Sequence, residues 1–436
     1  MSDEASPIRM LPLSAIVSSR RGLTYHADQL NGEAVNAVAY FNMKSFLKAG
    51  GLNVAGTKTF SGAVPSEFVL GKRDVLIANT DVTPGSDIIG SAALVPPEYL
   101  GRSTFSHHVT RLRVVDGTVE PSFLAKALLV ERVRHAMRAE SRGTTVKMLD
   151  LSGAMAIKIG VLPHSEQCRV VSILNTLDTA IHETEAIMAK LKAVKRGLLH
   201  DLLTRGIDEN DELRPPQAAA PHLYNESPLG WIPREWEASS VENEFAIDAG
   251  ITLGAHRLPK SRPRKYLRVA NVHRDKFSLE DIAELDAADS ETRVKALVVD
   301  DLLIVEGHAS TSQIGRCAIA DGRVVGMLFQ NHLFRLRSRR LLPAFALLWL
   351  NSGFAQAYWH CEAVTSSGLN TINRTKLHRL LVAVPPINEQ ITITSRKKAL
   401  EERIEIETRL HAKLKAEKSG LMDDLLTGRV RVTPLL

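Results

Sequence analysis

The sequence lacks any long apolar run and contains few cysteines. No apolar stretch reaches the ~18 residues that a membrane-spanning helix needs, and Asp3 and Glu4 lie where a secretory signal would turn apolar. The three cysteines, Cys168, Cys317 and Cys361, have neither zinc-site spacing nor the even number that a disulfide framework requires. These absences favour the reduced cytoplasmic compartment.

Sequence motifs for catalysis are also missing. We find no Gly-x-Gly fingerprint after a predicted strand, no Asn-Pro-Pro amino-methyltransferase motif and no Gly-x-x-x-x-Gly-Lys phosphate loop. His107, His108 and His332 have no carboxylate or cysteine at metal-ligand spacing, so we interpret them as packing residues. We therefore expect no catalytic, cofactor or metal site, which argues against a self-contained methylase or an ATP-driven translocase.

Length and composition set broad limits. A chain of 436 residues predicts two to four domains rather than one, and a hydrophobic content of 44% is ordinary for a globular protein. Aromatic residues make up only 5%. The net charge of +6 favours anionic partners such as nucleic acids only slightly.

The strongest positive signal is a segment that occurs twice. Residues 189–204 read AKLKAVKRGLLHDLLT and residues 412–427 read AKLKAEKSGLMDDLLT, with 12 of 16 positions identical at an offset of 223 residues. Upstream the match is weaker, but it aligns the Asp74 region with Asp301 and the Arg113 region with Arg337. A repeat of this length, present twice, indicates a duplicated and fused module and predicts an approximate internal two-fold.

The upstream part of each copy mixes strand-like and helical patterns. The predicted strands are Ala34–Tyr40, Asp74–Ala78, Val109–Val115, Tyr266–Val272, Leu302–Val305 and Leu328–Leu336. A helix is predicted after Pro121, as far as Ala139, and another after Pro343, as far as Trp359. The two upstream parts are therefore predicted to be globular domains of mixed order.

The downstream part of each copy predicts one long helix. The first begins near Ser165 and the second after Asn388, and both carry apolar residues at alternating spacings of three and four. Because neither stripe can be buried alone, we expect the helices to pack on each other as an antiparallel pair. The predicted seam comprises Val170, Ile173, Leu177, Ile187, Leu191, Leu198, Ile393, Leu400, Ile404, Leu410, Leu414 and Leu421. Gly197 and Gly420 predict a kink, a close helix crossing or early helix termination.

These patterns predict an α+β chain with five segments. They are a first globular domain (1–160), a first helical region (161–207), a surface linker (208–226), a second globular domain (227–384) and a second helical region (385–436). The expected architecture is two mixed α/β domains related by a pseudo-two-fold axis and separated by two long helices that form an antiparallel coiled coil.

Several motifs in this order resemble one known family. They are SPLGWIPREWE at Ser227–Glu237, YLRVANV at Tyr266–Val272, FQNHLFRLR at Phe329–Arg337, the Pro-x-x-Glu-Gln helix starts at Pro163 and Pro386, and the DLLT helix ends at Asp201 and Asp424. Over nearly its whole length the chain is similar to the specificity subunit of type I restriction–modification enzymes. The first half departs from this pattern because it lacks the Trp-rich opening.

The resemblance implies two target recognition domains, each reading one half of a split, asymmetric site in double-stranded DNA. It implies that the helices dock two methyltransferase subunits, and that restriction (translocase) subunits join the complex. It also implies that this chain is not an enzyme and holds no cofactor, since S-adenosylmethionine, ATP and magnesium would belong to those partners.

The candidate DNA contacts are basic side chains, which neutralise phosphates and can read guanine, together with polar loop residues. The candidates are Arg20, Arg21, Lys44, Lys58, Arg257, Lys260, Arg262, Arg264, Lys265, Arg274, Ser310 and Thr311. Ser310 and Thr311 belong to the polar loop Gly307–Gln313, and Asn79–Ser86 is its counterpart in the first half. For all of them, an ordinary solvated surface is the alternative interpretation.

Two alternative functions stay open on the sequence alone. The chain could be the specificity subunit of another class of restriction system, which its genomic neighbours would reveal. It could also be a coiled-coil scaffold whose globular parts bind proteins rather than DNA.

Overall fold

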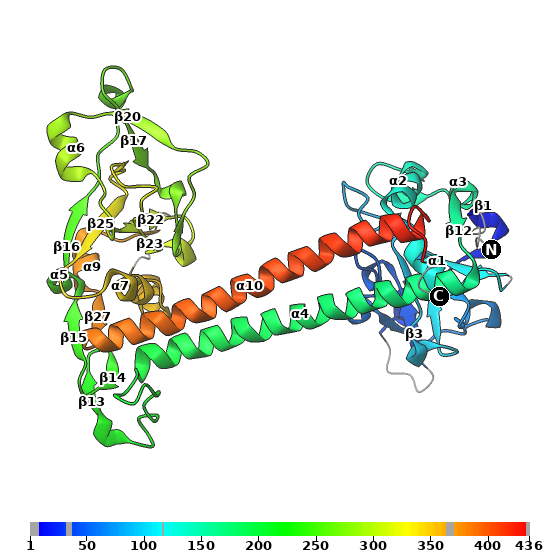
Figure 1. The fold of residues 1–436 in the computed structure, drawn as a ribbon, viewed down its shortest axis with the longest axis horizontal. Helices are drawn as coiled ribbons and strands as arrows, with labels where there is room; N and C mark the ends of the chain where they lie inside the picture. Colours follow the sequence, from blue (N-terminus) through cyan, green and yellow to red (C-terminus); the bar gives the residue numbers. More distant parts are fainter. Residues whose placement is uncertain (1–7, 32–36, 116, 363–369, 433–436) are drawn as a thin grey trace, which may run out of the picture. The chain divides into compact units, whose positions relative to one another are not determined.

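The computed structural model describes residues 8–31, 37–115, 117–362 and 370–432 (Figure 1). The chain packs as two units, one comprising Met1–Ala186 and Thr408–Leu436 and the other Ile187–Glu407. Each unit combines a globular part with one end of both long helices, α4 (His164–Thr204) and α10 (Ile387–Leu426). The fold is α+β, as predicted. The linear domain limits predicted from the sequence stay predictions, because the first unit joins segments from both ends of the chain.

The globular part of the first unit is built on a four-stranded antiparallel sheet. Its strand order is β2 (Val17–Arg21), β9 (Val109–Val114), β5 (Asp74–Ala78) and β7 (Ala92–Leu94). The smaller sheets are β4 (Lys58–Phe60)–β3 (Val38–Phe41)–β8 (Ser103–Phe105), β10 (Ser141–Arg142)–β11 (Lys147–Leu149)–β6 (Thr80–Asp81) and β1 (Arg9–Pro12)–β12 (Lys158–Val161). The helices are α1 (Pro121–Ala127), α2 (Glu131–Ala139) and α3 (Leu151–Ala156).

The second unit repeats this arrangement, except that one of its smaller sheets has two strands where the first unit has three. Its four-stranded sheet has the order β16 (Phe245–Ala249), β25 (Leu333–Ser338), β21 (Leu302–Val305) and β23 (Cys317–Ile319). The smaller sheets that correspond are β20 (Ala283–Asp286)–β17 (Pro263–Leu267)–β24 (Leu328–Phe329), β22 (Gly307–His308)–β26 (Asn370–Thr371) and β15 (Glu237–Ser240)–β27 (Leu381–Val384). The two globular parts therefore share one fold, which confirms the duplication inferred from the sequence.

Further elements complete the second unit. They are the hairpins β13 (Tyr224–Ser227)–β14 (Gly230–Pro233) and β18 (Val272–His273)–β19 (Lys276–Phe277), with helices α5 (Val241–Glu244), α6 (Asp289–Lys295), α7 (Pro343–Leu350), α8 (Gly353–Glu362) and α9 (Arg374–Arg379).

Several elements predicted from the sequence differ in extent. The predicted strand Tyr266–Val272 is strand only at its two ends, in β17 and β18. The helices expected after Pro121 and Pro343 are each broken into two, between α1 and α2 and between α7 and α8, so the break itself is duplicated. The predicted strand Leu328–Leu336 is two strands, β24 and β25, and Ala34–Tyr40 lies partly outside the described residues. The strands at Asp74–Ala78 and Leu302–Val305 have the predicted bounds.

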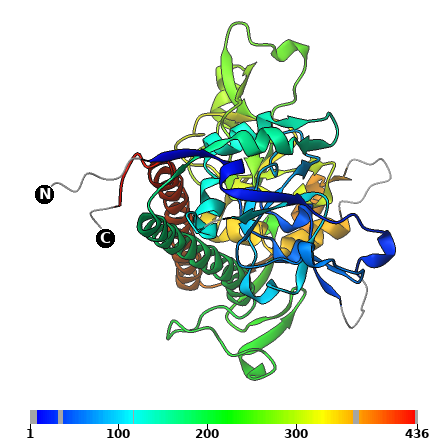
Figure 2. The ribbon, with the colours of Figure 1, turned by 90° about the vertical axis from the view of Figure 1, so that its right-hand side faces the viewer.

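In each unit the two long helices lie side by side and run antiparallel (Figures 1 and 2). In the first unit Lys418 Nζ lies 2.5 Å from Asp178 Oδ1, and His411 Nε2 lies 2.8 Å from Glu185 Oε1. In the second unit Lys195 Nζ lies 2.6 Å from Glu401 Oε1. The contact partners thus move forward along α4 as they move backward along α10, in equal steps of seven and ten residues. The helices are antiparallel, as predicted.

Most of the predicted seam residues are buried or half-buried, but two of them are not. Val170, Leu177, Leu191 and Leu198 are buried or half-buried, and so are Ile393, Leu400, Ile404, Leu414 and Leu421. Ile173 is half-buried against the core of the first unit. In contrast, Ile187 and Leu410 are 44% and 43% exposed, so they lie outside the seam. The seam passes instead through the residue that follows each of them, Met188 and His411.

Each long helix continues beyond its late glycine. α4 extends past Gly197 to Thr204 and α10 extends past Gly420 to Leu426, so early termination is excluded for both. A Cβ atom added at either glycine would meet nothing within 4 Å apart from its chain neighbours and the backbone of its own helix. Close helix packing therefore does not account for these two glycines.

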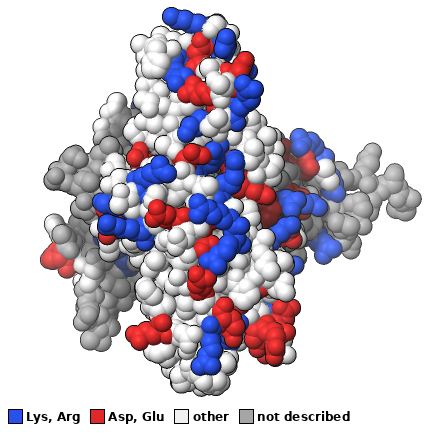
Figure 3. Space-filling view, turned by 90° about the vertical axis from the view of Figure 1, so that its left-hand side faces the viewer, with Lys and Arg blue, Asp and Glu red and all other residues white. Residues whose placement is uncertain are grey.

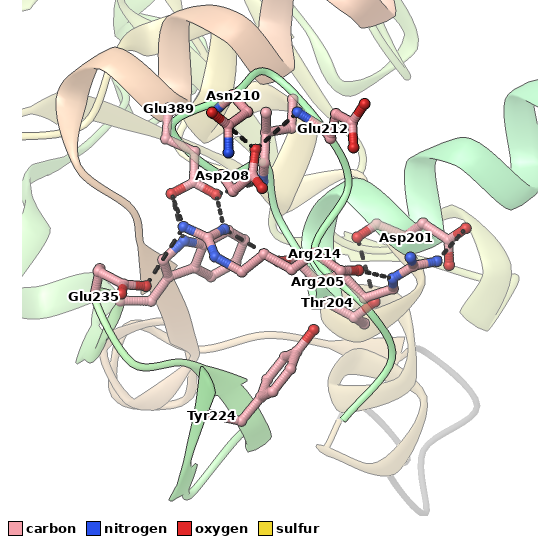
Figure 4. Close-up of polar contacts among 12 residues, drawn as sticks. Asp201, Thr204, Arg205, Asp208, Asn210, Glu212, Arg214, Tyr224, Glu235 and Glu389 are labelled. Atoms are coloured by element: carbon pink, nitrogen blue, oxygen red, sulfur yellow. Dashed lines mark hydrogen bonds and ion pairs between the residues drawn. The ribbon is translucent and has the colours of Figure 1, made fainter. Parts of the chain in front are cut away.

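The segment after α4, residues 208–226, is mostly exposed, but a buried arginine anchors it. Arg214 lies in it and is buried, with an ion pair to Glu389 in the first turn of α10 (Figure 4). Arg214 Nη1 donates to Glu389 Oε1 at 2.6 Å, and Trp236 Nε1 donates to Glu389 Oε2 at 2.9 Å. Burial would lower the pKa of Arg214, but its bond to Glu389 outweighs that effect and raises the pKa.

An equivalent arginine–glutamate ion pair exists in the first unit. Arg431, in the segment after α10, donates from Nε to Glu166 Oε2 at 2.8 Å, and Glu166 lies in the first turn of α4. Glu166 and Glu389 are equivalent at the offset of 223 residues. The segment that follows each long helix is thus tied to the start of the other helix, where the partial positive charge of the helix N-terminus also favours the carboxylate.

Candidate nucleic-acid interface

The basic residues predicted to contact DNA in the second unit fall into two groups. Arg257 and Arg264 are held by acidic neighbours: Arg257 donates to both oxygens of Glu291 at 2.6 and 2.8 Å, and Arg264 Nη2 lies 2.8 Å from Asp289 Oδ1. Arg274 is half-buried and donates from Nη2 to Ser312 O at 2.9 Å. Burial lowers the pKa of Arg274. These three guanidinium groups are committed to the fold.

The second group is exposed. It consists of Lys260, Arg262 and Lys265, which lie before and within β17. Figure 3 shows that basic and acidic side chains alternate over the visible face of this unit instead of forming a single positive field. The three exposed cations can therefore supply phosphate contacts locally, but they do not form a continuous basic track.

Ser310 and Thr311 are in a short turn beside β22. Ser310 is exposed, its Oγ lies 2.9 Å from Ser312 Oγ, and Thr311 is half-buried. The counterpart loop Asn79–Ser86 is only partly exposed. Asn79, Thr80, Asp81 and Ser86 are all buried there, because Thr80–Asp81 forms β6 and the Asp81 carboxylate accepts bonds from two backbone amides of the loop.

In the first unit the predicted basic residues are carried by several different elements. Arg20 lies with its guanidinium 5.2 Å from the ring centre of Phe68 and 3.9 Å from Glu67 Oε1. Arg21 and Lys44 are exposed, and Lys58 is half-buried in β4. Arg20 and Arg21 thus lie on the central sheet and Lys58 on a smaller sheet, and Arg21 is the last residue of β2.

Several residues that sequence comparison aligned between the halves form the same contacts in both units. Arg113 Nε lies 2.7 Å from Asp74 Oδ1, and Arg337 Nε lies 2.7 Å from Asp301 Oδ1. These matched pairs hold one end of each central sheet. Arg111 and Arg335 are buried and lie over Phe105 and Phe329, respectively, at 6.0 and 5.7 Å. The duplicated basic residues are therefore parts of the scaffold.

The histidines have partners that the sequence did not reveal. His108 Nδ1 lies 3.2 Å from Thr80 Oγ1, and His332 Nδ1 lies 2.9 Å from Glu306 Oε2. Burial, followed by the neighbouring His107 and Arg21, lowers the pKa of His108. Within the described ranges no group of three or more His, Cys, Asp or Glu side chains is arranged to hold a metal ion, and no helix there is long and apolar enough to span a membrane.

Comparisons with known proteins agree on one family. No protein-family model matches the chain. In sequence it is 21% identical over 373 residues to the type I restriction enzyme MjaVIII specificity subunit of Methanocaldococcus jannaschii, covering 85% of this chain and 82% of that protein. It is 22% identical over 351 residues to the putative type I restriction enzyme MjaX specificity subunit of the same organism, covering 79% of this chain and 76% of that protein.

Solved structures give the same answer for the fold. The HsdS subunit from Thermoanaerobacter tengcongensis superposes with a TM-score of 0.52 at 17% identity and covers 97% of each chain. A chain from a structure on complex assembly and conformational transition of the type I R–M system reaches a TM-score of 0.59 at 17% identity, over 98% of this chain and 100% of that one. The S subunit from M. genitalium gives a TM-score of 0.51 at 13% identity, over 98% and 97%. Over most of its sequence, and in its fold, the chain is therefore similar to the specificity subunits of type I restriction–modification systems.

Proposed function

We propose that this chain is the non-catalytic DNA-recognition subunit of a type I restriction–modification complex, and that each unit reads one half of a bipartite, asymmetric DNA site. The observation that carries the proposal is the combination of one scaffold with two unlike surfaces. The Asp74–Arg113 and Asp301–Arg337 pairs repeat the scaffold, whereas the exposed basic residues of the two units do not correspond. Two identical heads would read a palindrome, but unlike heads read an asymmetric site.

The antiparallel helix pair supports a role for α4 and α10 as a spacer and a docking element. Their matched sequences present the same kind of helical surface twice, so two copies of one methyltransferase subunit can dock, and restriction subunits can join them. S-adenosylmethionine, ATP and magnesium then act on those partners. A chain with this role works in the cytoplasm, where its DNA is.

The function is tested with the complex rather than with the chain alone. The chain is co-expressed with the methyltransferase encoded beside it, and modified adenines are mapped across the genome of the host. The proposal predicts one split motif with a gap of fixed length, and duplex binding that weakens steeply as salt rises. A protein-binding scaffold would give neither a motif nor a salt-sensitive complex with DNA. Nearby genes for a different restriction system would identify the other class.

A further inference from the structure

Because the two units share one fold, the side chains that are the same in both can be told from those that differ. In the central sheets, the strand ends that include Asp74 and Asp301 carry the same Asp–Arg pair in both units. Identical side chains on an identical scaffold cannot distinguish two different base sequences. Any discrimination between half-sites must therefore come from another part of each unit.

The opposite end of each central sheet keeps its backbone but changes its side chains. There the amide of Gly22 donates to Val109 O at 3.1 Å, and the equivalent Gly250 donates to Leu333 O at 3.3 Å. A Cβ atom on Gly22 would lie 2.2 Å from Phe105 O, and one on Gly250 would lie 2.3 Å from Phe329 O. Glycine is thus required at both positions by the same close approach of two backbone segments.

Further backbone hydrogen bonds at this end also match. The amide of His107 donates to Leu23 O at 2.9 Å, and that of Asn331 donates to Ile251 O at 3.0 Å. A second pair links adjacent strands: Asn79 N donates to His108 O at 3.0 Å, and Glu306 N donates to His332 O at 3.0 Å. A third pair joins the small sheet at this end, from Leu149 N to Asn79 O at 2.8 Å and from Ile372 N to Glu306 O at 2.7 Å.

The side chains carried on this constant backbone are different hydrogen-bonding groups. In the first unit they are those of Arg21, which is exposed, and His107 and His108, which are half-buried. In the second unit the position of Arg21 is taken by Ala249, and that of His107 by Asn331. Gln330 precedes Asn331, and both are half-buried, while the His332 side chain is 55% exposed.

These groups match the chemistry of base edges. An arginine fork pairs with the two acceptors of guanine in the major groove, and asparagine or glutamine pairs with the acceptor and donor of adenine. His108 and His332 occupy equivalent positions, so both units carry a histidine at this end of the central sheet. In contrast, the basic residues before and within β17 either pair with acidic side chains or are exposed cations suited to phosphate.

We propose, on the basis of the function proposed above, that this end of each central sheet is the base-reading surface: Arg21 reads a guanine in one half-site, and Asn331 reads an adenine in the other. The exposed cations Lys260, Arg262 and Lys265 position the backbone of the DNA and carry no sequence information.

The test maps modified adenines for the complete complex with Arg21→Ala and with Asn331→Ala. Arg21→Ala is expected to reduce discrimination at one guanine of one half-site by roughly 5- to 150-fold, and Asn331→Ala to do the same at one adenine of the other half-site. Arg21→Lys keeps the positive charge but lacks the fork, so it is expected to lose the same discrimination. If Arg21→Ala lowers modification equally at all sites and Arg21→Lys restores it, Arg21 contacts a phosphate. That result would overturn the proposal.

Matched controls lie at the other end of the same sheets. Arg73→Ala and Asn243→Ala change exposed residues beside the starts of β5 and β16, and both are expected to leave the motif unchanged. Circular dichroism on each purified complex confirms that the variant is folded. If the unaltered complex yields no split motif, the proposed function fails. If it yields one and both alanine variants retain it in full, the base-reading surface is wrong and the function stands.

Discussion

Lys418 and Asp178 form an ion pair between the two long helices, with 2.5 Å between Nζ and Oδ1. At an offset of 223 residues the same pair recurs as Lys195 and Glu401, at 2.6 Å. Burial raises the pKa of Asp178, but the bonds from Lys418 and Lys126 outweigh burial and lower it. The pKa of Glu401 is lowered in the same way by Lys195 and Lys397. Two helices that are equivalent in sequence therefore make equivalent contacts.

The two ion pairs should contribute equally and independently. We expect a double-mutant cycle on Lys418→Met and Asp178→Asn to give a coupling of about 1 kcal/mol, because both groups are half-buried. The cycle on Lys195→Met and Glu401→Gln should give a similar value. The effects of Lys195→Met and Lys418→Met should add within about 0.5 kcal/mol, since the pairs share no partner. Urea unfolding followed by circular dichroism measures all of these terms, and a coupling near zero in either cycle would contradict the register.

Replacing Glu389 should destabilise its unit more than replacing the equivalent Glu166. The side chains of Glu389 and Arg214 are only 7% and 9% exposed, so Glu389→Gln leaves a buried arginine without its counter-charge, at a cost of about 3–5 kcal/mol. Arg214→Met should restore most of this loss. All four tryptophans, Trp231, Trp236, Trp349 and Trp359, lie in the second unit, so their fluorescence reports its unfolding. Glu166→Gln in the first unit is the control, and an equal shift of the fluorescence midpoint for both variants would contradict this prediction.

Gly197 and Gly420 should each be replaceable by alanine with a gain in stability. Both lie inside long helices, and a Cβ atom at either would meet nothing within 4 Å, so Gly→Ala should stabilise the chain by about 1 kcal/mol. Gly206→Ala is the matched opposite case. Its φ is +62°, and a Cβ atom would lie 2.1 Å from Glu389 Oε1, so this variant should be destabilised. Thermal unfolding of the three variants orders them, and a loss of stability in Gly197→Ala would show that the helix is strained there.

His108 should titrate below its ordinary pKa of 6.5. Burial and then the charges of His107 and Arg21 disfavour its protonated form, so the folded pKa lies below the unfolded one. His108 is neutral in both states above pH ~6.5, and its protonation penalty destabilises the fold as pH falls below that value. Histidine-selective NMR on Arg21→Ala should show the pKa of His108 rising toward 6.5. An unchanged titration would mean that Arg21 does not act on this histidine.

The sequence predicted the fold where the repeat was preserved. Asp74, Asp301, Arg113 and Arg337 could be aligned because each pair occupies the same sheet position twice, and the structure joins Asp74 to Arg113 and Asp301 to Arg337. The seam was harder to predict. In α10 one of its two heptad positions is occupied by Lys397, Ile404, His411 and Lys418, so an apolar pattern marks only one of these four residues. Lysine stems can pack in the seam while their charged ends pair across it, which a hydrophobic periodicity does not register.

The candidate interface was predicted less well, for a related reason. Charge density in the sequence singled out Arg257 and Arg264, but their acidic partners Glu291 and Asp289 follow more than twenty residues later. Pairing at that separation depends on the fold of β17 and α6. In the same way, nothing near Glu389 in the sequence indicates that Arg214, in an apparent linker, closes on it.

The central claim is that one duplicated scaffold carries two dissimilar reading units. The most direct measurement exchanges residues 227–384 for the corresponding domain of a relative and maps modified adenines with the methyltransferase partner present. The account predicts that one half of the split motif changes while the other half and the length of the gap are kept. A motif in which both halves change together, or an unsplit motif from the original chain, would contradict it.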